Sequence, residues 1–246
     1  MEDTIKKAVG RVIEAIQKDL GEQHSVDEMA RTAMFSKFHF SRIFQRITGI
    51  SPGRFLMVMR LHRAKQLLLS TSLSVTEITH EVGYTSIGTF SSRFSSSVGV
   101  SPSTYRRLGG VTPRVPVDHR WTVLEPPAAT IHGEVRAADT ITDTIGYVFV
   151  GLFRDPVPLG LPVRCVILDS VGQFTLENAP TGSWYVLAYS SIDGNDALAV
   201  PAEQNALVGS FGPLTIRNDT VSVKADIRLR PMNAFDPPVL LALPDL

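Results

Sequence analysis

The amino-acid sequence predicts an α+β multidomain fold, in which an all-α domain built from a repeated helical unit precedes an all-β sandwich domain. Three observations support this prediction. A pattern of cap residues, apolar residues and aromatic residues occurs twice within residues 1–108. The helical period then stops at Gly109-Gly110. Beyond this glycine pair, short apolar runs alternate with clusters of Gly, Pro, Asn and Asp, which is typical of a domain made of short strands.

The repeat has two copies about 50 residues apart. The first begins at Ser25-Val26-Asp27-Glu28-Met29 and the second at Ser74-Val75-Thr76-Glu77-Ile78, an offset of 49 residues. Every later pair is offset by 50 residues, so the second copy carries one additional residue near its middle. The later positions that recur are Phe40, Phe44, Gly49-Ile50-Ser51-Pro52 and Phe55 in the first copy, and Phe90, Phe94, Gly99-Val100-Ser101-Pro102 and Tyr105 in the second.

Each copy contains the signals that begin and end helices. Two capping boxes, in which a serine oxygen accepts a backbone N–H and a glutamate returns to the cap, are Ser25 with Glu28 and Ser74 with Glu77. Ser51-Pro52 and Ser101-Pro102 place a cap residue before a proline that suits the first helical turn, and the preceding glycines can end a helix. Ser36 and the Thr85-Ser86 pair can cap one further helix in each copy. The sequence therefore predicts a helix, a tight turn and a helix in each copy, which is a tandem helix-turn-helix.

Residues Lys6 to Arg107 resemble the DNA-binding domain of the AraC/XylS family of transcription regulators. The most specific part of the resemblance lies in the second copy, at Ile78-Thr79-His80-Glu81-Val82-Gly83-Tyr84 and Gly99-Val100-Ser101-Pro102-Ser103-Thr104-Tyr105-Arg106-Arg107. The resemblance implies that a long helix, here about Pro52 to Leu69, joins the two units. Its apolar residues offer faces to both halves, which predicts a rigid connection: Leu56, Met59, Leu61, Ala64, Leu67 and Leu68. Because successive major-groove faces lie about 34 Å apart, the two units are expected to read neighbouring grooves as a monomer.

The first expected recognition helix runs from Ser36 to Arg46, with Phe40, Ile43 and Phe44 turned inward at helical spacing. The DNA-binding residues expected on its other faces are Lys37, Phe38, His39, Ser41, Arg42 and Arg46. The resemblance gives base-reading positions to three of them, namely Phe38, Ser41 and Arg42.

Arg42 is the leading base-reading residue, because its guanidinium can bond guanine O6 and N7 in the major groove. The alternative is an arginine that neutralises a phosphate or pairs with a carboxylate. His39 has no partner at metal-ligand spacing, so a phosphate or solvent role is favoured over metal binding.

The second expected recognition helix departs from the family pattern, because it contains one cation where the family usually has several. Its expected DNA-binding residues are Ser86, Ile87, Thr89, Ser91, Ser92 and Arg93. Gly88 costs this helix about 1 kcal/mol relative to alanine. Ile87 can contact a thymine methyl group, with a solvent-exposed or dimer-facing isoleucine as the alternative. We expect this half to hold phosphates weakly.

The charge distribution agrees with a nucleic-acid partner for the first part of the chain only. The whole chain has 24 Lys and Arg against 24 Asp and Glu, a net charge of zero. Residues 1–110 carry 15 basic against 9 acidic residues, and residues 111–246 carry 9 against 15. A basic domain attracts phosphate without regard to sequence, whereas an acidic one repels it. The expected organisation is a DNA-binding domain at 1–108, an extended linker at 109–120 and a β-sandwich at 121–246.

The second domain is predicted from short strand-like runs, of which Thr220 to Leu229 alternates most clearly between apolar and polar residues. The other candidate strands are Thr130 to Val135, Tyr147 to Phe153, Val163 to Leu168, Gln173 to Leu176 and Ser183 to Tyr189. The stretch Asp169 to Ala188 resembles the hairpin of transthyretin-like, carboxypeptidase-regulatory-type sandwiches, with Pro180-Thr181-Gly182 as its turn. The Asp193-Gly194-Asn195-Asp196 stretch is expected to be a plain turn and not a calcium loop.

Aromatic residues of this domain could line a small-molecule pocket, although most are expected in its core: Trp121, Phe149, Phe153, Trp184, Tyr185 and Tyr189. The apolar tail Pro237 to Leu243 could offer an edge or patch to a partner, and the alternative is an internally packed last strand of the sandwich. No nucleophile with a base, paired carboxylates or phosphate loop is apparent, so we expect no enzyme, no metal and no cofactor.

Taken together, these patterns predict a sequence-specific DNA-binding transcription regulator controlled through its β-sandwich. The expected partner is double-stranded DNA, and a small-molecule effector, a second copy of the chain and RNA polymerase are further candidates. The single Cys165, the lack of an apolar signal segment and the lack of a transmembrane run predict a cytoplasmic protein with no membrane partner. The alternative is a β-sandwich that binds a ligand or a protein, joined to a degenerate DNA-binding half.

Overall fold

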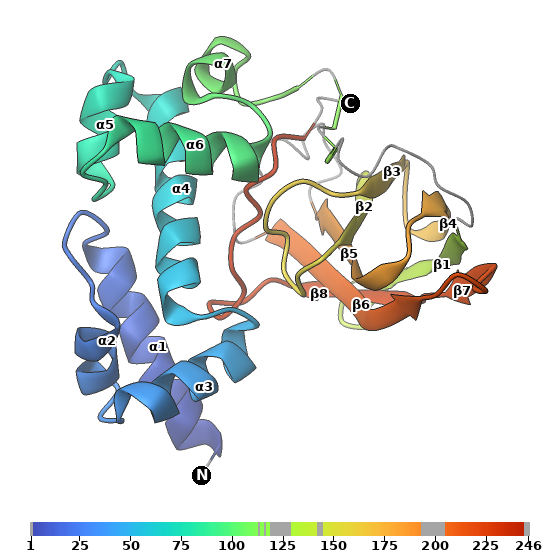
Figure 1. The fold of residues 1–246 in the computed structure, drawn as a ribbon, viewed down its shortest axis with the longest axis horizontal. Coiled ribbons are helices and arrows are strands. Elements are labelled where there is room, and N and C mark those ends of the chain that lie inside the picture. Colours follow the sequence, from blue (N-terminus) through green and yellow to red (C-terminus); the bar gives the residue numbers. More distant parts are fainter. Residues whose placement is uncertain are drawn as a thin grey trace. The chain divides into compact units, whose positions relative to one another are not determined.

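The computed structural model describes residues 2–112, 114–115, 117–118, 129–141, 145–192 and 205–243. It divides into a helical unit (1–95, 101–109 and 233–240) and a β unit (96–100, 110–232 and 241–246) (Figure 1). The predicted fold class is confirmed, because helices make up the first part of the chain and strands the second. Trp121, the Asp193–Asp196 stretch and the end of the expected linker lie outside the described residues.

The helical unit contains the predicted tandem helix-turn-helix, preceded by a helix that the sequence analysis did not anticipate. That helix is α1 (Glu2–Lys18), whose buried residues Val9, Val12, Ile13 and Ile16 recur at helical spacing. The remaining helices are α2 (Val26–Thr32), α3 (Lys37–Thr48), α4 (Pro52–Ser70), α5 (Val75–Glu81), α6 (Ile87–Val98) and α7 (Pro102–Arg107).

Local signals place the helix ends where the sequence predicts them. Both capping boxes form, since the Ser25 and Ser74 oxygens accept the N–H groups of Glu28 and Glu77 and each carboxylate accepts the cap N–H. The Ser101 oxygen accepts the Thr104 N–H at the start of α7. Ser36 and Ser51 occupy cap positions without a side-chain hydrogen bond.

The additional residue of the second copy lies in the turn between its two short helices. Four residues, 33–36, separate α2 from α3, whereas five residues, 82–86, separate α5 from α6. Each turn has one residue in the left-handed region, Met34 at φ 61° in the first and Gly83 at φ 80° in the second. Glycine adopts this conformation without a Cβ penalty, whereas methionine does not.

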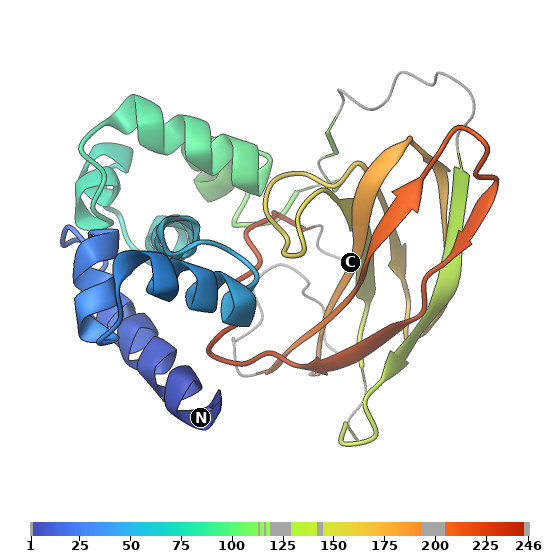
Figure 2. The same cartoon turned by 60° about the horizontal axis from the view of Figure 1, so that its bottom comes forward.

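Helix α4 is the shared core of the two modules. It packs against α2 and α3 of the first module and against α5 and α7 of the second. Its six predicted apolar residues, Leu56, Met59, Leu61, Ala64, Leu67 and Leu68, are all buried. Figure 1 shows α3 near the N-terminal end of α4 and α6 near its C-terminal end. In Figure 2, where α4 is seen close to end-on, α3 and α6 lie on either side of it.

Equivalent aromatic residues fill the cores of the two modules. Phe44 packs against Phe40 and Phe55 with ring centroids 5.4 and 5.3 Å apart. Phe94 packs against Phe90 and Tyr105, in both cases at 5.7 Å. The repeat in the sequence is therefore a repeat in packing.

The β unit is an eight-stranded sheet that folds over so that strands from both halves contribute to one core. Its strands are β1 (Ala129–Ala137), β2 (Val148–Phe153), β3 (Arg164–Leu168), β4 (Gly172–Ala179), β5 (Gly182–Ser191), β6 (Ala206–Ile216), β7 (Ser222–Lys224) and β8 (Ile227–Pro231). Their order is β3-β2-β5-β6-β8-β1-β4, with β7 paired to β1. Strand β8 joins the two halves, because it is antiparallel to β6 and parallel to β1.

The predicted hairpin between β4 and β5 is wrong, although both strands exist. Strand β4 pairs with β1, whereas β5 pairs with β2 and β6. The Pro180-Thr181-Gly182 turn therefore connects strands that have different partners, and the Trp184 indole N–H donates to the Pro180 carbonyl across it at 2.8 Å. Trp184 and Val186, not Tyr185, belong to the core of the β unit.

The predicted strand from Thr220 to Leu229 is interrupted and forms β7 and β8. The break lies opposite Gly133 of β1, where a Cβ would lie 2.1 Å from the Ala225 carbonyl oxygen, so only glycine fits this close approach of the two backbones. The Asp226 carboxylate accepts the Glu134 N–H at 3.1 Å in place of a ladder bond. Val221 is exposed, contrary to the expected alternation.

Strand β6 was not predicted, because glycines and a proline interrupt its apolar pattern at Gly209 and Gly212-Pro213. Gly209 is required by close packing, since a Cβ there would lie 2.8 Å from the Arg228 carbonyl oxygen of β8. The other expected aromatic residues Phe149, Phe153 and Tyr189 are buried.

The apolar tail is packed internally, as the alternative expects, but it is not a strand, and the expectation of an exposed patch is wrong. Leu240, Leu241, Ala242 and Leu243 are buried and adopt no regular structure. The part Asn233–Leu240, hereafter the return segment, belongs to the helical unit. The Lys65 ammonium of α4 donates to the carbonyl oxygens of Val239 and Leu240 at 3.4 and 3.0 Å.

Candidate nucleic-acid interface

Helix α3 separates its apolar and polar residues as the sequence predicts. Phe40, Ile43 and Phe44 are buried, and Thr48 closes the helix with its hydroxyl bonded to the Phe44 carbonyl at 2.9 Å. Gly49, in the left-handed conformation at φ 80°, ends the helix. The helix thus has one anchored face, and its remaining faces are free to meet a ligand.

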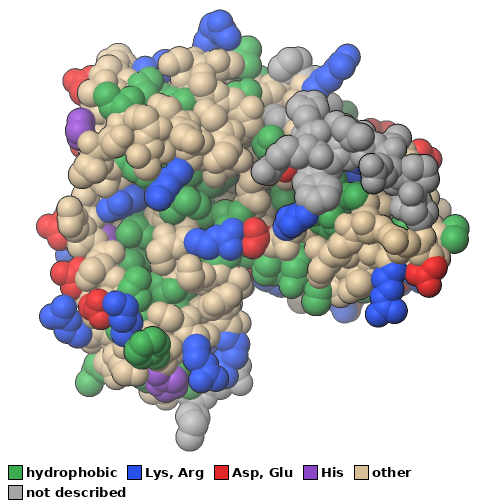
Figure 3. All heavy atoms as spheres, viewed as in Figure 1, with side chains coloured by type: hydrophobic (Ala, Val, Ile, Leu, Met, Phe, Trp, Pro, Cys, Tyr) green, Lys and Arg blue, Asp and Glu red, His purple; other side chains and the backbone are tan. Residues whose placement is uncertain are grey.

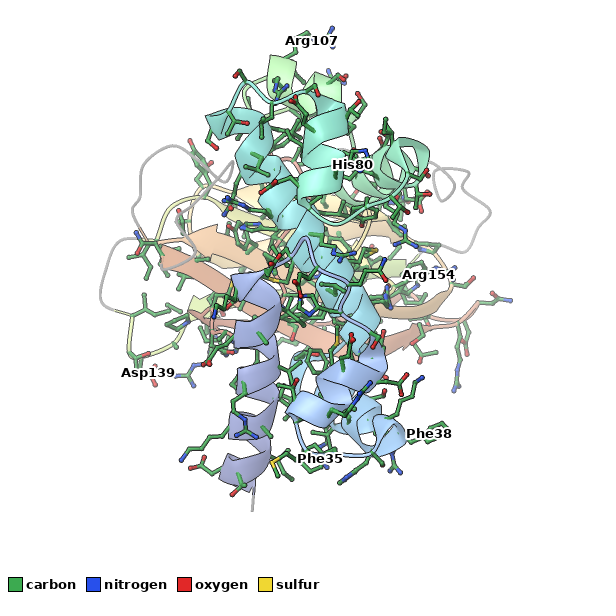
Figure 4. The ribbon with its side chains drawn as sticks, turned by 90° about the vertical axis from the view of Figure 1, so that its left-hand side faces the viewer. Phe35, Phe38, His80, Arg107, Asp139 and Arg154 are labelled. Carbon is green, nitrogen blue, oxygen red and sulfur yellow. The ribbon has the colours of Figure 1, made fainter. Side chains whose placement is uncertain are left out.

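The predicted DNA-binding residues of α3 lie on those remaining faces. Lys37, Phe38, His39, Arg42 and Arg46 are exposed, and Ser41 is half-buried. Phe38 is 84% exposed, which is unusual for a phenylalanine in a soluble domain. Figure 4 shows Phe38 projecting away from the body of the helical unit. Gln45, which the helical spacing also places nearer to solvent or DNA, is likewise exposed on α3.

Three of these side chains differ in how they are held. The Lys37 ammonium forms an ion pair with the Asp27 carboxylate at 2.8 Å, both partners being about half exposed. The His39 ring meets the Phe35 ring edge-on at 5.0 Å, which fits a packing and solvent role for this histidine. Among the described residues, no hydrogen bond or ion pair holds the Arg42 guanidinium. Arg42 therefore remains available for a ligand.

Helix α6 repeats this geometry with less charge. Phe90, Phe94 and Val98 are buried, whereas the predicted residues Ser86, Ile87, Thr89, Ser92 and Arg93 are exposed and Ser91 is half-buried. The Ser86 hydroxyl accepts the Thr89 N–H at 3.3 Å, so one predicted DNA-binding residue also stabilises the start of this helix. Figure 3 shows Lys and Arg side chains gathered over the α3 end of the helical unit, whereas the surface over α6 is mainly neutral.

Two residues of α6 are not simple surface residues. Ile87 is 43% exposed at the start of the helix. The Arg93 guanidinium lies over the Tyr84 ring at 5.9 Å from its centroid. The attraction between a cation and an aromatic ring competes with binding of that cation to a phosphate. The asymmetry between the helices is therefore larger than their composition suggests.

Two charged residues of α4 with structural consequences for this site were missed by the sequence analysis. Arg60 donates to backbone carbonyls of the first module, and Lys65 donates to those of the return segment. Arg60 and Lys65 are charged residues among the apolar residues with which α4 packs. Their presence there was the only signal in the sequence that they have a structural role. Their partners are distant in the sequence, so the pattern of α4 alone could not name them.

Comparisons with known proteins agree with this geometry. Residues 29–108 match a family model described as a helix-turn-helix domain. The chain is 40% identical over 96 residues to an uncharacterized HTH-type transcriptional regulator of Haemophilus influenzae, covering 39% of this chain and 32% of that protein. It is 30% identical over 98 residues to the HTH-type transcriptional activator AarP of Providencia stuartii, covering 40% of this chain and 73% of AarP. The chain belongs to the AraC/XylS family of transcription regulators.

The membership rests on the helical unit, since the relatives match about two fifths of this chain. The chain spans only about a third of the length of the Haemophilus relative and of the lactose operon transcription activator of Staphylococcus xylosus, to which it is 27% identical over 104 residues. One similar solved structure is the DNA-binding domain of AdpA in complex with a target DNA. It has 30% identity and a TM-score of 0.40, and the match covers 41% of this chain and 90% of that chain.

Two further observations concern the described part of this AraC/XylS member. None of its described helices combines the length and the apolar character that crossing a membrane would require. Within the same residues, no three His, Cys, Asp or Glu side chains come together as they would to hold a metal ion.

Proposed function

We propose that this protein is a sequence-specific DNA-binding transcription regulator that reads adjacent major grooves with α3 and α6. The observation that carries the proposal is the pair of equivalent modules, each with a recognition helix whose buried face is anchored by two phenylalanines and whose other face is exposed. A helix presented in this way fits the major groove, where side chains can reach base edges. Relatives named as transcription activators support the same function.

In this proposal α3 supplies most of the sequence reading. Arg42 bonds a guanine edge, Phe38 contacts a thymine methyl group, and Ser41 contacts a neighbouring base or phosphate. Lys37 and Arg46 neutralise phosphates, and Lys37 exchanges its Asp27 partner for one. Helix α6 contributes shape and weak contacts through Ile87 and its hydroxyl residues.

The experiment is a selection of bound duplexes from a random DNA pool by the full-length protein, followed by titration of the enriched site. Arg42→Ala is the test variant and Ser92→Ala is the matched control on α6. We expect a loss of about 1 to 3 kcal/mol for Arg42→Ala, with relaxed specificity at one position, and a much smaller loss for Ser92→Ala. Equal losses would remove the assignment of α3 as the principal reader.

We also propose that the β unit regulates DNA binding by the helical unit. Two features support it: the β unit carries the acidic excess of the chain, which disfavours contact with phosphate, and the return segment that follows β8 belongs to the helical unit. The candidate inputs are a small-molecule effector, a second copy of the chain and RNA polymerase.

The test of regulation is the DNA affinity of the full chain with and without each input. Sedimentation with and without the enriched duplex reports a second copy, and thermal shifts over a metabolite panel report an effector. A protein that binds metabolites but selects no DNA sequence would instead support the β unit as a carrier joined to an inactive DNA-binding half.

A further inference from the structure

The two helix-turn-helix modules touch each other at a second place besides the linker helix α4. The loop after α1 in the first module, Asp19–Glu22, lies against the turn after α5 in the second module, Glu81–Tyr84. A Cβ on Gly21 would lie 3.1 Å from the Glu81 carbonyl oxygen, and a Cβ on Gly83 would lie 2.7 Å from the Leu20 carbonyl oxygen. Real Cβ atoms do not tolerate the second distance, so the two backbones meet where side chains do not fit.

Arg60 of α4 ties this contact to the linker helix. Its Nε donates to the Leu20 carbonyl at 3.0 Å and its Nη2 donates to the Glu22 carbonyl at 2.7 Å. The same guanidinium lies over the Tyr84 ring at 5.9 Å from its centroid, and a Cβ on Gly83 would lie 2.6 Å from its Nη2. Arg60 therefore contacts both modules from the middle of the helix that joins them.

The chemistry of arginine suits this position. A guanidinium presents several N–H groups in one plane and can serve two carbonyl acceptors at once, whereas a lysine ammonium is a point charge on a flexible stem. Burial lowers the pKa of Arg60, and the guanidinium nevertheless keeps its charge because arginine is not deprotonated in proteins. The bonds to Leu20 and Glu22 are charge-assisted and so stronger than neutral ones.

We propose that Arg60 is a positioning residue that fixes the distance and rotation between α3 and α6, and that it thereby sets the spacing of the two DNA half-sites. This inference rests on the proposed function. Helix α4 has 19 residues and is about 28 Å long, and a single helix of that length can bend. A bonded contact beside the helix resists bending. A change of one base pair moves a half-site by about 3.4 Å along the duplex and rotates it, so a stiff joint discriminates between spacings.

The first experiment measures spacing discrimination. The DNA site selected by the wild-type protein is rebuilt with one or two base pairs added or removed between its half-sites, and each duplex is titrated. Arg60→Met removes the donors and keeps an apolar stem, and Arg60→Lys keeps the charge without the fork. Arg63→Met is the matched control, because Arg63 is an exposed arginine on the same helix and its guanidinium donates to the side-chain oxygen of Gln66 on that helix.

We expect the wild-type protein and Arg63→Met to lose at least tenfold in affinity for each altered spacing. Arg60→Met should bind the original site about tenfold more weakly and distinguish the spacings less than threefold, with Arg60→Lys in between. If Arg60→Met weakens binding relative to the wild-type protein by the same factor at every spacing, its role is merely structural and the proposal is overturned. Unchanged affinity of Arg60→Met at every spacing also overturns it.

A second measurement does not depend on DNA. Gln45→Cys on α3 and Ser92→Cys on α6 carry spin labels at exposed positions, in a background in which the single Cys165 is replaced by alanine. The distribution of distances between the labels should be narrow with Arg60 and broad with Arg60→Met, while circular dichroism shows unchanged helix content. Equal distributions overturn the proposal. If the wild-type protein selects no DNA but the distance distributions differ as expected, the proposed function is wrong, whereas the role of Arg60 in fixing α3 relative to α6 is supported.

Discussion

Replacing Lys65 by methionine tests how a buried cation affects the stability of the helical unit. Lys65 is 7% exposed, and its ammonium donates to the Val239 and Leu240 carbonyl oxygens of the return segment. Its Nζ also lies 5.6 Å from the centroid of the Tyr105 ring. Burial lowers the pKa of Lys65 from its ordinary value of 10.5 to about 8. A charge in this environment carries a desolvation cost that three partners offset only in part.

The sign and size of the effect follow from the two pKa values. Between pH 8 and pH 10.5 the unfolded chain holds a proton on Lys65 that the folded chain has released. The free energy of unfolding therefore rises with pH through this window. The difference between these two pKa values corresponds to about 3 kcal/mol in total, of which about 2 kcal/mol is gained between pH 7 and pH 9.5. Burial raises the pKa of Tyr105, which opposes this trend above pH 10, so pH 9.5 is the upper limit of the experiment.

The assay is unfolding in denaturant at pH 7 and pH 9.5, with circular dichroism at 222 nm following the helices. Tryptophan fluorescence follows the β unit separately, because both tryptophans, Trp121 and Trp184, lie in the second part of the chain. The matched control is Lys18→Met, at an exposed lysine of α1. The wild-type protein and Lys18→Met should gain about 2 kcal/mol relative to Lys65→Met over this interval. Parallel pH dependence in all three proteins would refute the buried-cation account.

Three further predictions concern the helix-turn-helix modules. Met34→Gly should raise the free energy of unfolding by about 1 kcal/mol, because it relieves a left-handed backbone and removes only an exposed side chain; Met34→Ala is the control and should give no gain in the same denaturant titration. Ser74→Ala should lower it by about 1 kcal/mol through loss of the cap, and an unchanged midpoint would contradict the capping box seen here. Hydrogen bonds from Ser74 lower the pKa of Glu77, so this carboxylate stabilises the fold above its ordinary pKa of 4.5 and the contribution is lost as pH falls. The melting temperature of Glu77→Gln should therefore depend less on pH between pH 6 and pH 3 than that of the wild-type protein. The same pH dependence in both proteins would count against this prediction.

The helical unit could be predicted from the sequence because its signals are local. A capping box places its serine and glutamate three residues apart, and an aromatic core residue recurs at helical spacing. The predicted faces of α3 and α6 follow from the same periodicity, so the exposed position of Arg42 was accessible from the sequence alone. Helix α1 was missed because it precedes the repeat and has no equivalent in the second copy.

The β unit could be predicted in class but not in topology. The sequence indicates where strands lie, whereas the choice of partner depends on residues far away, as in the pairing of β4 with β1 and not with β5. Strand β6 needs Gly209 where β8 approaches closely, and because glycine is typical of loops, the sequence pattern did not indicate a strand there. The return segment was equally inaccessible, because the partner of its carbonyl groups is Lys65, more than 170 residues earlier.

We infer that two unequal recognition helices on one rigid unit read two adjacent grooves. The most direct test is selection from a random duplex pool by the full-length protein, followed by footprinting of the enriched site. We expect two protected blocks about 10 base pairs apart, centre to centre, with the stronger base preference in the block that loses specificity in Arg42→Ala. Folded protein that enriches no sequence, or that protects a single block, would contradict it.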